Sequence, residues 1–392
     1  MRRGILAAIV LGILAIPFLG VRIVPGPEGD GLAARWAPPL WVAAVVLAAF
    51  LAARVLPRLP AIPLPGQWPG ILGLTLATAL PFLPDGWLRA ASGWDLGGMQ
   101  PLGWLSLETL TTLWLYLVLA LGLNLIVGQT GVLVLGYGAF YAIGAYSMAL
   151  LATRLLPYWA ALGLGVLLGA LLAGGAGVLV GFPALRLKGD YLAIVTLGFG
   201  EALVLVLKNW EAVTGGNNGV NITPGMLKSL KGTWAYPSGT WHYGLALGAA
   251  VLALVFHARL NRSRIGRALA AVREDETAAR AMGIHASRMK LLAFALAAAW
   301  AGVAGALFAA RQRFITPESF TFQASVTILA MVVLGGMGSL RGVVLGAVLV
   351  MLLKEGLREF GAYRELAFGA LLVAVMVLRP QGLASGSRET GR

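Results

Sequence analysis

Long apolar segments alternate with short polar segments along most of this chain. A helix that crosses a bilayer needs about 20 mostly apolar residues. On that basis, we expect spans at about residues 4–21, 39–56, 69–84, 105–127, 131–152, 158–181, 191–208, 242–258, 290–310, 323–339, 342–357 and 364–379. The pair that flanks Gly335 to Gly342 can instead form one broken or re-entrant feature, which leaves about 10–12 spans. The pattern predicts an all-α fold, a polytopic transmembrane helical bundle.

One long segment, Arg259 to Lys290, interrupts the apolar pattern. It contains eight Arg or Lys residues and three acids, separated mainly by alanine and other small residues. Each charge at the centre of a bilayer would cost about 2.5–3.5 kcal/mol, so this segment must lie in water. Its Ala, Arg and Glu content favours a helix, and Gly283 suits the end of that helix or a break in it. The segment is either a docking surface for a soluble partner or an ordinary basic loop.

The composition indicates an integral membrane protein. Of its 392 residues, 59% are hydrophobic and only 12% are charged, and the mean hydropathy is +0.83. Soluble domains contain only about 45–50% apolar residues. The absence of Cys excludes disulfides and thiolate metal sites. No P-loop, nucleophile elbow, zinc-protease motif or channel filter occurs, so the sequence predicts no catalytic, metal-binding or cofactor-binding residue on this chain.

The net charge of +14 is explained by an excess of Lys and Arg in cytoplasmic loops rather than by a nucleic-acid partner. If the N-terminus is cytoplasmic, most of the 30 Lys and Arg residues fall on the cytoplasmic side of the predicted spans, as the positive-inside rule requires. The C-terminus is then cytoplasmic too, segment 259–290 is a cytoplasmic loop and segment 210–241 is external. The first apolar segment is interpreted as a retained span, because no signal-peptide cleavage site follows it.

The chain divides into three parts. Residues 1–104 form a peripheral N-terminal transmembrane unit of about three spans, whose loops are rich in Pro or in Gly and Trp. Residues 105–380 form the working core, which contains both long loops. Residues 381–392 form a cytoplasmic tail.

Glycines and polar residues are concentrated in two of the core spans. A Gly-Gln-Thr-Gly break at residues 128–131 is typical of the unwound helix ends that line substrate paths in transporters. The same glycines also suit close helix packing, as do the two GxxxG pairs within residues 165–181, and the sequence leaves both interpretations open. Glu201 is an intramembrane carboxylate, which indicates either a functional role or a contact with a neighbouring subunit or Lys208. The candidate path residues are Asn124, Gly128, Gln129, Thr130, Gly136, Tyr137, Gly138, Tyr141, Gly198, Gly200 and Glu201.

The external loop contains a Gly- and Asn-rich hexapeptide, for which tight turns are expected. It is either a passive connector or a surface that a ligand-delivering partner contacts. The candidate contact residues are Thr214, Gly215, Gly216, Asn217, Asn218 and Gly219.

Four motifs, at residues 123–151, 185–201, 214–219 and 266–284, together resemble the larger membrane subunit of bacterial branched-chain amino acid ABC importers. The resemblance extends over about Leu105 to Pro380. It implies a permease core that pairs with a second, related permease subunit around a central translocation path. It also implies two P-loop ATPase subunits, which hold ATP and Mg, and a periplasmic binding protein that delivers leucine, isoleucine or valine. The chain would then be a non-enzymatic subunit in the bacterial inner membrane.

ABC importers commonly carry the cytoplasmic coupling motif E-A-A-x-x-x-G. Here Ala278, Ala279 and Gly283 keep the spacing, Thr277 stands where Glu is usual, and Glu276 lies one position earlier. The I-x-L-P tail of the motif is absent. The resemblance implies that these five residues form the ATPase-coupling helix, whose movement on ATP binding and hydrolysis would alternate access between the two sides of the membrane.

Three alternatives remain at this point. Importers of the same architecture carry urea or short amides. An ion-coupled secondary transporter would need intramembrane acids, for which Glu201 and Glu108 are the candidates. An enzyme that acts on lipid-linked sugars would need acids or His in an external loop, and residues 210–241 offer only Glu211 as an acid, so this class ranks last.

Overall fold

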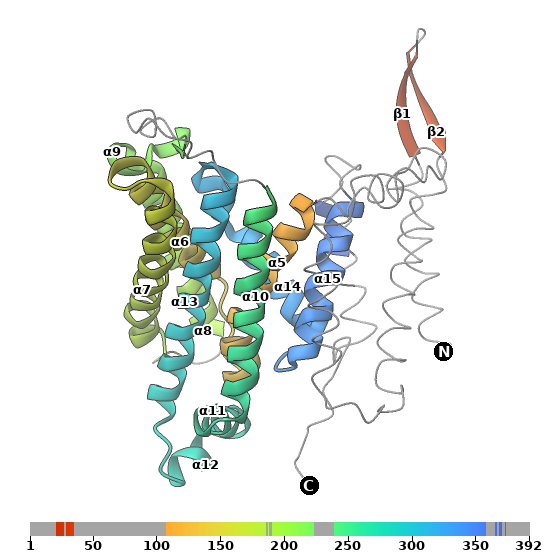
Figure 1. Cartoon of the computed structure of the whole chain (residues 1–392). Helices are drawn as coiled ribbons and strands as arrows, with labels where there is room; N and C mark the ends of the chain where they lie inside the picture. Colours follow the sequence, from red (N-terminus) through yellow and green to blue (C-terminus); the bar gives the residue numbers. More distant parts are fainter. Residues whose placement is uncertain are drawn as a thin grey trace, which may run out of the picture.

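The structure is a computed structural model of the chain (Figure 1), and it describes residues 21–26, 29–34, 107–185, 187, 190–222, 239–357, 365–366, 368–370 and 373. The three predicted N-terminal spans lie outside these ranges, apart from Val21, as does the predicted C-terminal tail. Between the first two predicted spans, strand β1 (Val21–Gly26) pairs antiparallel with β2 (Gly29–Ala34).

Eight long helices in the described ranges correspond to eight of the nine spans predicted between residues 105 and 380. Within the described part of the chain, six helical segments are long and apolar enough to cross a membrane. The eight helices are α5 (Leu107–Thr130), α6 (Tyr137–Arg154), α7 (Tyr158–Ala184), α8 (Asp190–Asn209), α10 (Gly239–Arg262), α13 (Ala286–Gln312), α14 (Phe322–Gly335) and α15 (Leu340–Gly356). The short elements are α9 (Glu211–Thr214), η3 (Gly216–Asn218), β3 (Val220–Asn221), α11 (Arg264–Glu274), α12 (Glu276–Ala281), β4 (Phe314–Ile315) and η5 (Pro317–Phe320).

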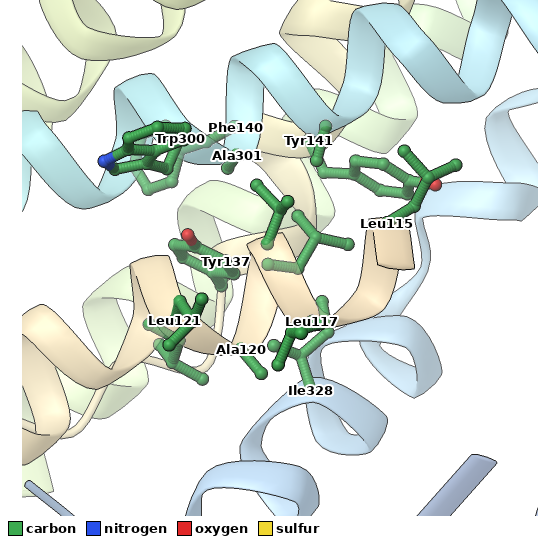
Figure 2. Close-up of a cluster of buried hydrophobic side chains, with 14 of the residues drawn as sticks. Leu115, Leu117, Ala120, Leu121, Tyr137, Phe140, Tyr141, Trp300, Ala301 and Ile328 are labelled. Atoms are coloured by element: carbon green, nitrogen blue, oxygen red, sulfur yellow. The ribbon is translucent and has the colours of Figure 1, made fainter. Parts of the chain in front are cut away.

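Helix α13 lies at the centre of the bundle, where it packs against α5, α6, α7 and α10. Its inner face is almost entirely alanine and glycine, so neighbouring backbones approach closely, as is common among membrane helices. Leucines and aromatic side chains of α5, α6, α13 and α14 fill the space beside it (Figure 2). The interior of this chain is therefore packed with side chains.

Glycines bring three of these helices together. A Cβ atom built on Gly144 of α6 would lie 2.1 Å from the carbonyl oxygen of Gly302 in α13, and one built on Gly302 would lie 2.2 Å from that of Gly169 in α7. The GxxxG pairs of α7 are likewise buried, so helix packing explains them. The leucines on the other side of α7 are exposed and suit contact with lipid.

The two predicted hydrophilic loops lie at opposite ends of the bundle, with α9 at the top of Figure 1 and α11 and α12 at the bottom. Strand β3 of the upper loop pairs antiparallel with β4, which follows α13. This arrangement agrees with the predicted placement of the two loops on different sides of a membrane.

The structure corrects the predicted spans at two glycine-rich places. Residues 131–136 are not helical, although a span was predicted to begin at residue 131, and α6 begins only at Tyr137. The predicted span 323–339 ends early, at Gly335, because Gly336 and Gly338 have φ angles of 111° and 87° that break the helix. Helices α14 and α15 therefore form a hairpin with a short turn.

Candidate functional site

The charged segment folds into two short helices rather than the single helix that its composition predicts. Asp275 separates them: its backbone is extended, and its carboxylate accepts hydrogen bonds from the backbone N–H groups of Thr277 (2.7 Å) and Ala278 (3.0 Å). An aspartate N-cap of this kind satisfies amide donors that the first turn of a helix leaves unpaired. Gly283, with a φ angle of 82°, follows the end of α12, as predicted.

Two sets of contacts hold α12 against the base of the bundle. Val272 of α11, Ala279 of α12 and Ala286 of α13 are buried together in a small apolar cluster. The Glu276 carboxylate accepts hydrogen bonds from Lys290 of α13 and from Arg280, each at 2.5 Å. A displacement of α12 is therefore transmitted to both neighbouring helices.

The outward side of α12 and of the turn after it carries small residues and one large apolar residue, beside the Arg280 side chain, which is 59% exposed. Thr277, Ala278 and Gly283 are exposed, whereas Ala279 faces the apolar cluster and is 4% exposed. Met282 is 82% exposed, which is unusual for a large apolar side chain. We call Thr277, Ala278, Met282 and Gly283 the α12 surface.

The pKa of the Glu276 carboxyl group is lowered, chiefly by its hydrogen bond from Lys290 and further by the charges of Lys290 and Arg280. Because the folded-state pKa is lowered, this contact is fully stabilising above the ordinary pKa of about 4.3 and is lost as the pH falls through the lowered value. We expect the distribution of distances between spin labels on α12 and α13 to stay constant between about pH 5.5 and 8. The distribution should broaden below about pH 4. The Glu276→Gln variant should lack this pH dependence, and an identical pH profile in both proteins would contradict the assignment.

The break predicted at residues 128–131 lies slightly later in the structure, as an unwound segment at residues 131–136, because Gly128, Gln129 and Thr130 still belong to α5. Helix α5 ends at Thr130, Gly131 has a φ angle of 71°, and residues 131–136 connect to α6 without helical structure. The backbone N–H of Leu135 donates to the Thr196 hydroxyl of α8 (3.2 Å), and Leu133 is 39% exposed. The break thus lies between α5 and α8, near the end of the bundle that carries α11.

Most polar candidates around this break are hydrogen-bonded inside the chain. The Asn124 side chain accepts from the backbone N–H of Gly338 (2.8 Å), and the Gln129 amide donates to the Asn261 side chain. The Thr130 hydroxyl donates to the carbonyl of Ile126 four residues earlier in α5 (2.7 Å). Asn124 and Gln129 thus join α5 to the turn between α14 and α15 and to the end of α10.

The aromatic and glycine candidates of α6 also lie within the packed interior. Tyr137 is fully buried, and its hydroxyl donates to the carbonyl of Ala297 (2.8 Å). The Tyr141 ring packs against Phe320, with centroids 5.1 Å apart. The backbone N–H of Gly138 donates to the Ser325 hydroxyl (2.8 Å).

The candidates on α8 divide between two faces of that helix. Gly200 lies against Gly136, and a Cβ atom on Gly200 would lie 3.0 Å from the Cα of Gly136. Gly198 and Glu201 are exposed, and nothing lies within 4 Å of a Cβ atom built on Gly198. Within the described ranges, Glu201 forms no ion pair. Tyr191, Ile194, Val195 and Leu205 share its exposed face.

The hexapeptide of the upper loop forms the expected tight turns. Gly215, Gly216 and Gly219 all have positive φ angles, and the buried Thr214 hydroxyl donates to the carbonyl of Leu207 (2.6 Å). Asn217 and Asn218 are exposed. The turn is thus a hydrogen-bonded element that presents two amide side chains.

A cavity of about 430 Å³ lies at the same end of the bundle, where α5 and α10 begin and α13 ends. Arg311 donates a hydrogen bond to the Thr112 hydroxyl (2.5 Å) beside it. The lining residues are Leu107, Glu108, Thr111, Gly239, His242, Arg311, Gln312 and Arg313.

Sequence reasoning did not identify Met282 or Arg273 as functional candidates. Met282 follows α12 directly, and its exposure depends on how that helix packs. Arg273 stands among many basic residues, and nothing in the sequence distinguishes it. Its guanidinium donates to the carbonyl of Gly128 (2.5 Å), a contact across 145 residues.

Comparisons with known proteins agree with this architecture. The profile of the family described as "Branched-chain amino acid transport system / permease component" matches residues 105–378. The chain is 47% identical over 304 residues to the high-affinity branched-chain amino acid transport system permease protein LivM of Salmonella typhimurium, a match that covers 72% of this chain and 71% of that protein. It is 46% identical over 307 residues to the LivM protein of Escherichia coli, with 73% and 71% covered.

A second type of permease matches more distantly. The LivH permease protein of Salmonella typhimurium is 27% identical over 285 residues, which cover 68% of this chain and 90% of LivH. No solved structure matches the chain.

Proposed function

Since this chain belongs to the permease family of branched-chain amino acid transport systems, we propose that it is the larger membrane permease subunit of an ATP-binding cassette importer for leucine, isoleucine and valine. It works beside a second, related permease subunit, in a bacterial inner membrane with both of its termini in the cytoplasm. The similarity to both LivM and LivH proteins supports two related permeases in one system.

The α12 surface is the observation that carries the mechanism. It is a small, exposed, partly apolar surface at the end of the bundle, and its helix is fixed to α11 and α13 by the apolar cluster and by Glu276. Such a surface suits insertion into a groove of a soluble partner. ATPase subunits that hold ATP and Mg dock there, and their movement tilts the attached spans. The coupling residues are Glu276, Thr277, Ala278, Ala279 and Gly283, with Met282 added as an apolar anchor.

The substrate path runs along the exposed face of α8 rather than through the interior of this chain. Two observations support this position. The interior between α5, α6 and α13 is filled by buried side chains (Figure 2). In addition, Glu201 lies on the exposed face of a span, and a carboxylate in the hydrocarbon region normally faces a water-lined cavity or another protein rather than lipid. The second permease subunit covers this face, with Gly198 and Glu201 at the path.

The hydrogen-bonded turn in the upper loop faces the side from which substrate arrives. Its exposed Asn217 and Asn218 offer hydrogen-bond donors and acceptors to a periplasmic binding protein. Hydrogen bonds from the backbone N–H groups of Gly215 and Gly219 to the carbonyls of Glu211 and Gly216 hold this turn in one conformation, so little entropy is lost on contact.

Purification from native membranes followed by reconstitution tests the function. We expect two ATPase subunits and a second permease to copurify with the chain, and proteoliposomes to take up labelled leucine only with ATP and binding protein. Uptake by the chain alone, driven by an ion gradient, would overturn the proposal. Preferential uptake of urea or acetamide would instead show that the importer carries urea or short amides.

Glu201→Gln tests the path. A hydrogen bond to a charged group contributes about 1.5–3 kcal/mol, so loss of a carboxylate that faces the substrate ammonium group should lower uptake about tenfold or more. The fold of this chain should remain intact, because Glu201 is not part of its packed interior, and copurification of the second permease subunit checks assembly. Ala202→Ser, on the same exposed face, is the matched control. Normal leucine uptake by Glu201→Gln proteoliposomes would exclude this role.

A further inference from the structure

Arg273 connects the cytoplasmic helices to the unwound segment. It lies near the end of α11, and its Nη1 atom donates to the carbonyl oxygen of Gly128 at 2.5 Å. Gly128 is in the last turn of α5, directly before residues 131–136. The side chain therefore joins an element outside the membrane to the point at which a span is broken.

The turn between α14 and α15 belongs to the same contact. A Cβ atom built on Gly338 would lie 2.6 Å from Nη1 of Arg273 and 2.9 Å from the carbonyl oxygen of Gly128. The backbone N–H of Gly338 donates to Asn124 (2.8 Å). There is therefore no space for a side chain at position 338. The guanidinium group of Arg273 lies where the two interrupted helical regions, α5–α6 and α14–α15, meet.

Electrostatics explain why a cation occupies this position. The last carbonyl groups of a helix lack partners within the helix and carry partial negative charge, which a nearby cation stabilises. Helix α5 has no basic residue in its own last turn. Arg273 supplies that charge from another helix, so the capping of α5 depends on the position of α11.

The position of α11 in turn depends on α12. Val272, the neighbour of Arg273, is buried against Ala279 and Ala286, and Glu276 binds Lys290. A displacement of the α12 surface therefore moves the helix end that carries Arg273. The path from the α12 surface to residues 131–136 consists of direct contacts throughout.

We propose that Arg273 is a positioning residue that transmits the movement of the cytoplasmic helices to the unwound segment and to the α14–α15 turn. This inference rests on the proposed function, since it assumes that partner ATPases move α12. Arg273 holds the end of α5 in one state of the transport cycle and releases or shifts it in another. It touches neither substrate nor nucleotide.

Arg273→Gln, Arg273→Lys and Arg267→Gln test this inference in the complete complex with ATPases, partner permease and binding protein. Arg267 is the matched control because its guanidinium also donates to a backbone carbonyl, that of Arg262, within the cytoplasmic segment. We expect Arg273→Gln to assemble and to hydrolyse ATP at the basal rate, with leucine uptake and stimulation by binding protein reduced at least tenfold. Arg273→Lys should recover part of the leucine uptake and part of the stimulation by binding protein, because the ammonium group keeps the charge and can donate to the Gly128 carbonyl, although it lacks the planar shape of the guanidinium group.

A structural readout separates transmission from stability. The chain contains no Cys, so introduced cysteines are its only spin-labelling sites. They are placed at Ala270 of α11 and at Leu133, both exposed and outside the α12 surface. In the unsubstituted complex, trapping with ATP and vanadate should shift both labels relative to a label on the periplasmic end of α13. In Arg273→Gln, the label at position 270 should still shift and the label at position 133 should not.

The outcomes separate the role of Arg273 from the proposed function of the whole chain. Normal uptake by Arg273→Gln, or an unchanged shift at position 133, would overturn the role of Arg273 alone. Failure of Arg273→Gln to assemble, without recovery in Arg273→Lys, would show a purely structural residue and would also overturn it. Failure of the unsubstituted chain to bind ATPases would overturn the proposed function itself.

Discussion

Gly136→Ala is expected to prevent the chain from folding into a stable bundle. A Cβ atom at this position would lie 1.8 Å from the carbonyl oxygen and 2.7 Å from the carbonyl carbon of Thr196. Both are backbone atoms of α8, so no side-chain rotation can relieve the overlap. Overpacking of an interior commonly costs about 1–3 kcal/mol, and an overlap with rigid backbone should exceed that range. The unwound segment must then separate from α8.

Gly163→Ala and Gly244→Ala are the matched controls, because nothing lies within 4 Å of a Cβ atom at either position. Alanine is favoured over glycine in a helix by about 1 kcal/mol, so these variants should be neutral or slightly stabilising. Detergent-solubilised protein can be compared by size-exclusion chromatography and thermal unfolding. We expect at least a tenfold lower yield of monodisperse Gly136→Ala protein. Equal yield and melting temperature for Gly136→Ala and Gly163→Ala would show that the close approach of the two backbones is not present in the protein.

Met282→Asp is expected to remove the ATPase subunits from the complex and with them ATP-driven uptake. Burial of a methionine side chain contributes about 1.5–3 kcal/mol, and the substitution also forces a carboxylate to lose water on docking. Met282 is 82% exposed and makes little contribution to the packed interior. The fold should therefore survive, and the loss should be confined to association. Ala278→Glu, on the same surface, should have a similar effect.

Ala270→Glu is the matched control, since it adds the same charge type at an exposed position of α11. Copurification of ATPase subunits with a tagged chain measures association, and leucine uptake into proteoliposomes measures function. We expect at least tenfold weaker association for Met282→Asp and near-normal association for Ala270→Glu. If both variants retain the ATPase subunits, the α12 surface is not their docking site.

The fold was largely predictable because the membrane imposes a simple rule. Each span must satisfy its own backbone hydrogen bonds, so long apolar runs become helices, and α5, α7, α10 and α13 follow the predicted runs closely. The rule fails where glycine makes helix and non-helix similar in energy. The sequence placed the first break at residues 128–131, with a span beginning at residue 131, and left a broken feature open around Gly335 to Gly342. Contacts with α8 and α5 locate the breaks at residues 131–136 and at Gly336 to Gly338.

The sites were predicted less completely than the fold. The spacing of Ala278, Ala279 and Gly283 located the cytoplasmic helix, and Gly283 ends it as expected. The sequence did not show that Ala279 faces inward or that Met282 faces outward, because exposure depends on how α12 packs against α11 and α13.

The sequence alone determined that this chain is a helical membrane protein and predicted that its two long polar loops lie on opposite sides of the membrane. Both follow from hydrophobicity and charge, which can be read locally along the chain. Its four motifs also indicated the permease family. Only the tertiary structure decided which glycines pack and which remain exposed, and it brought Arg273, Gly128 and Gly338 together. Contacts between residues so distant in sequence depend on backbone approach and on the direction of individual side chains, and no periodicity in a single sequence records either.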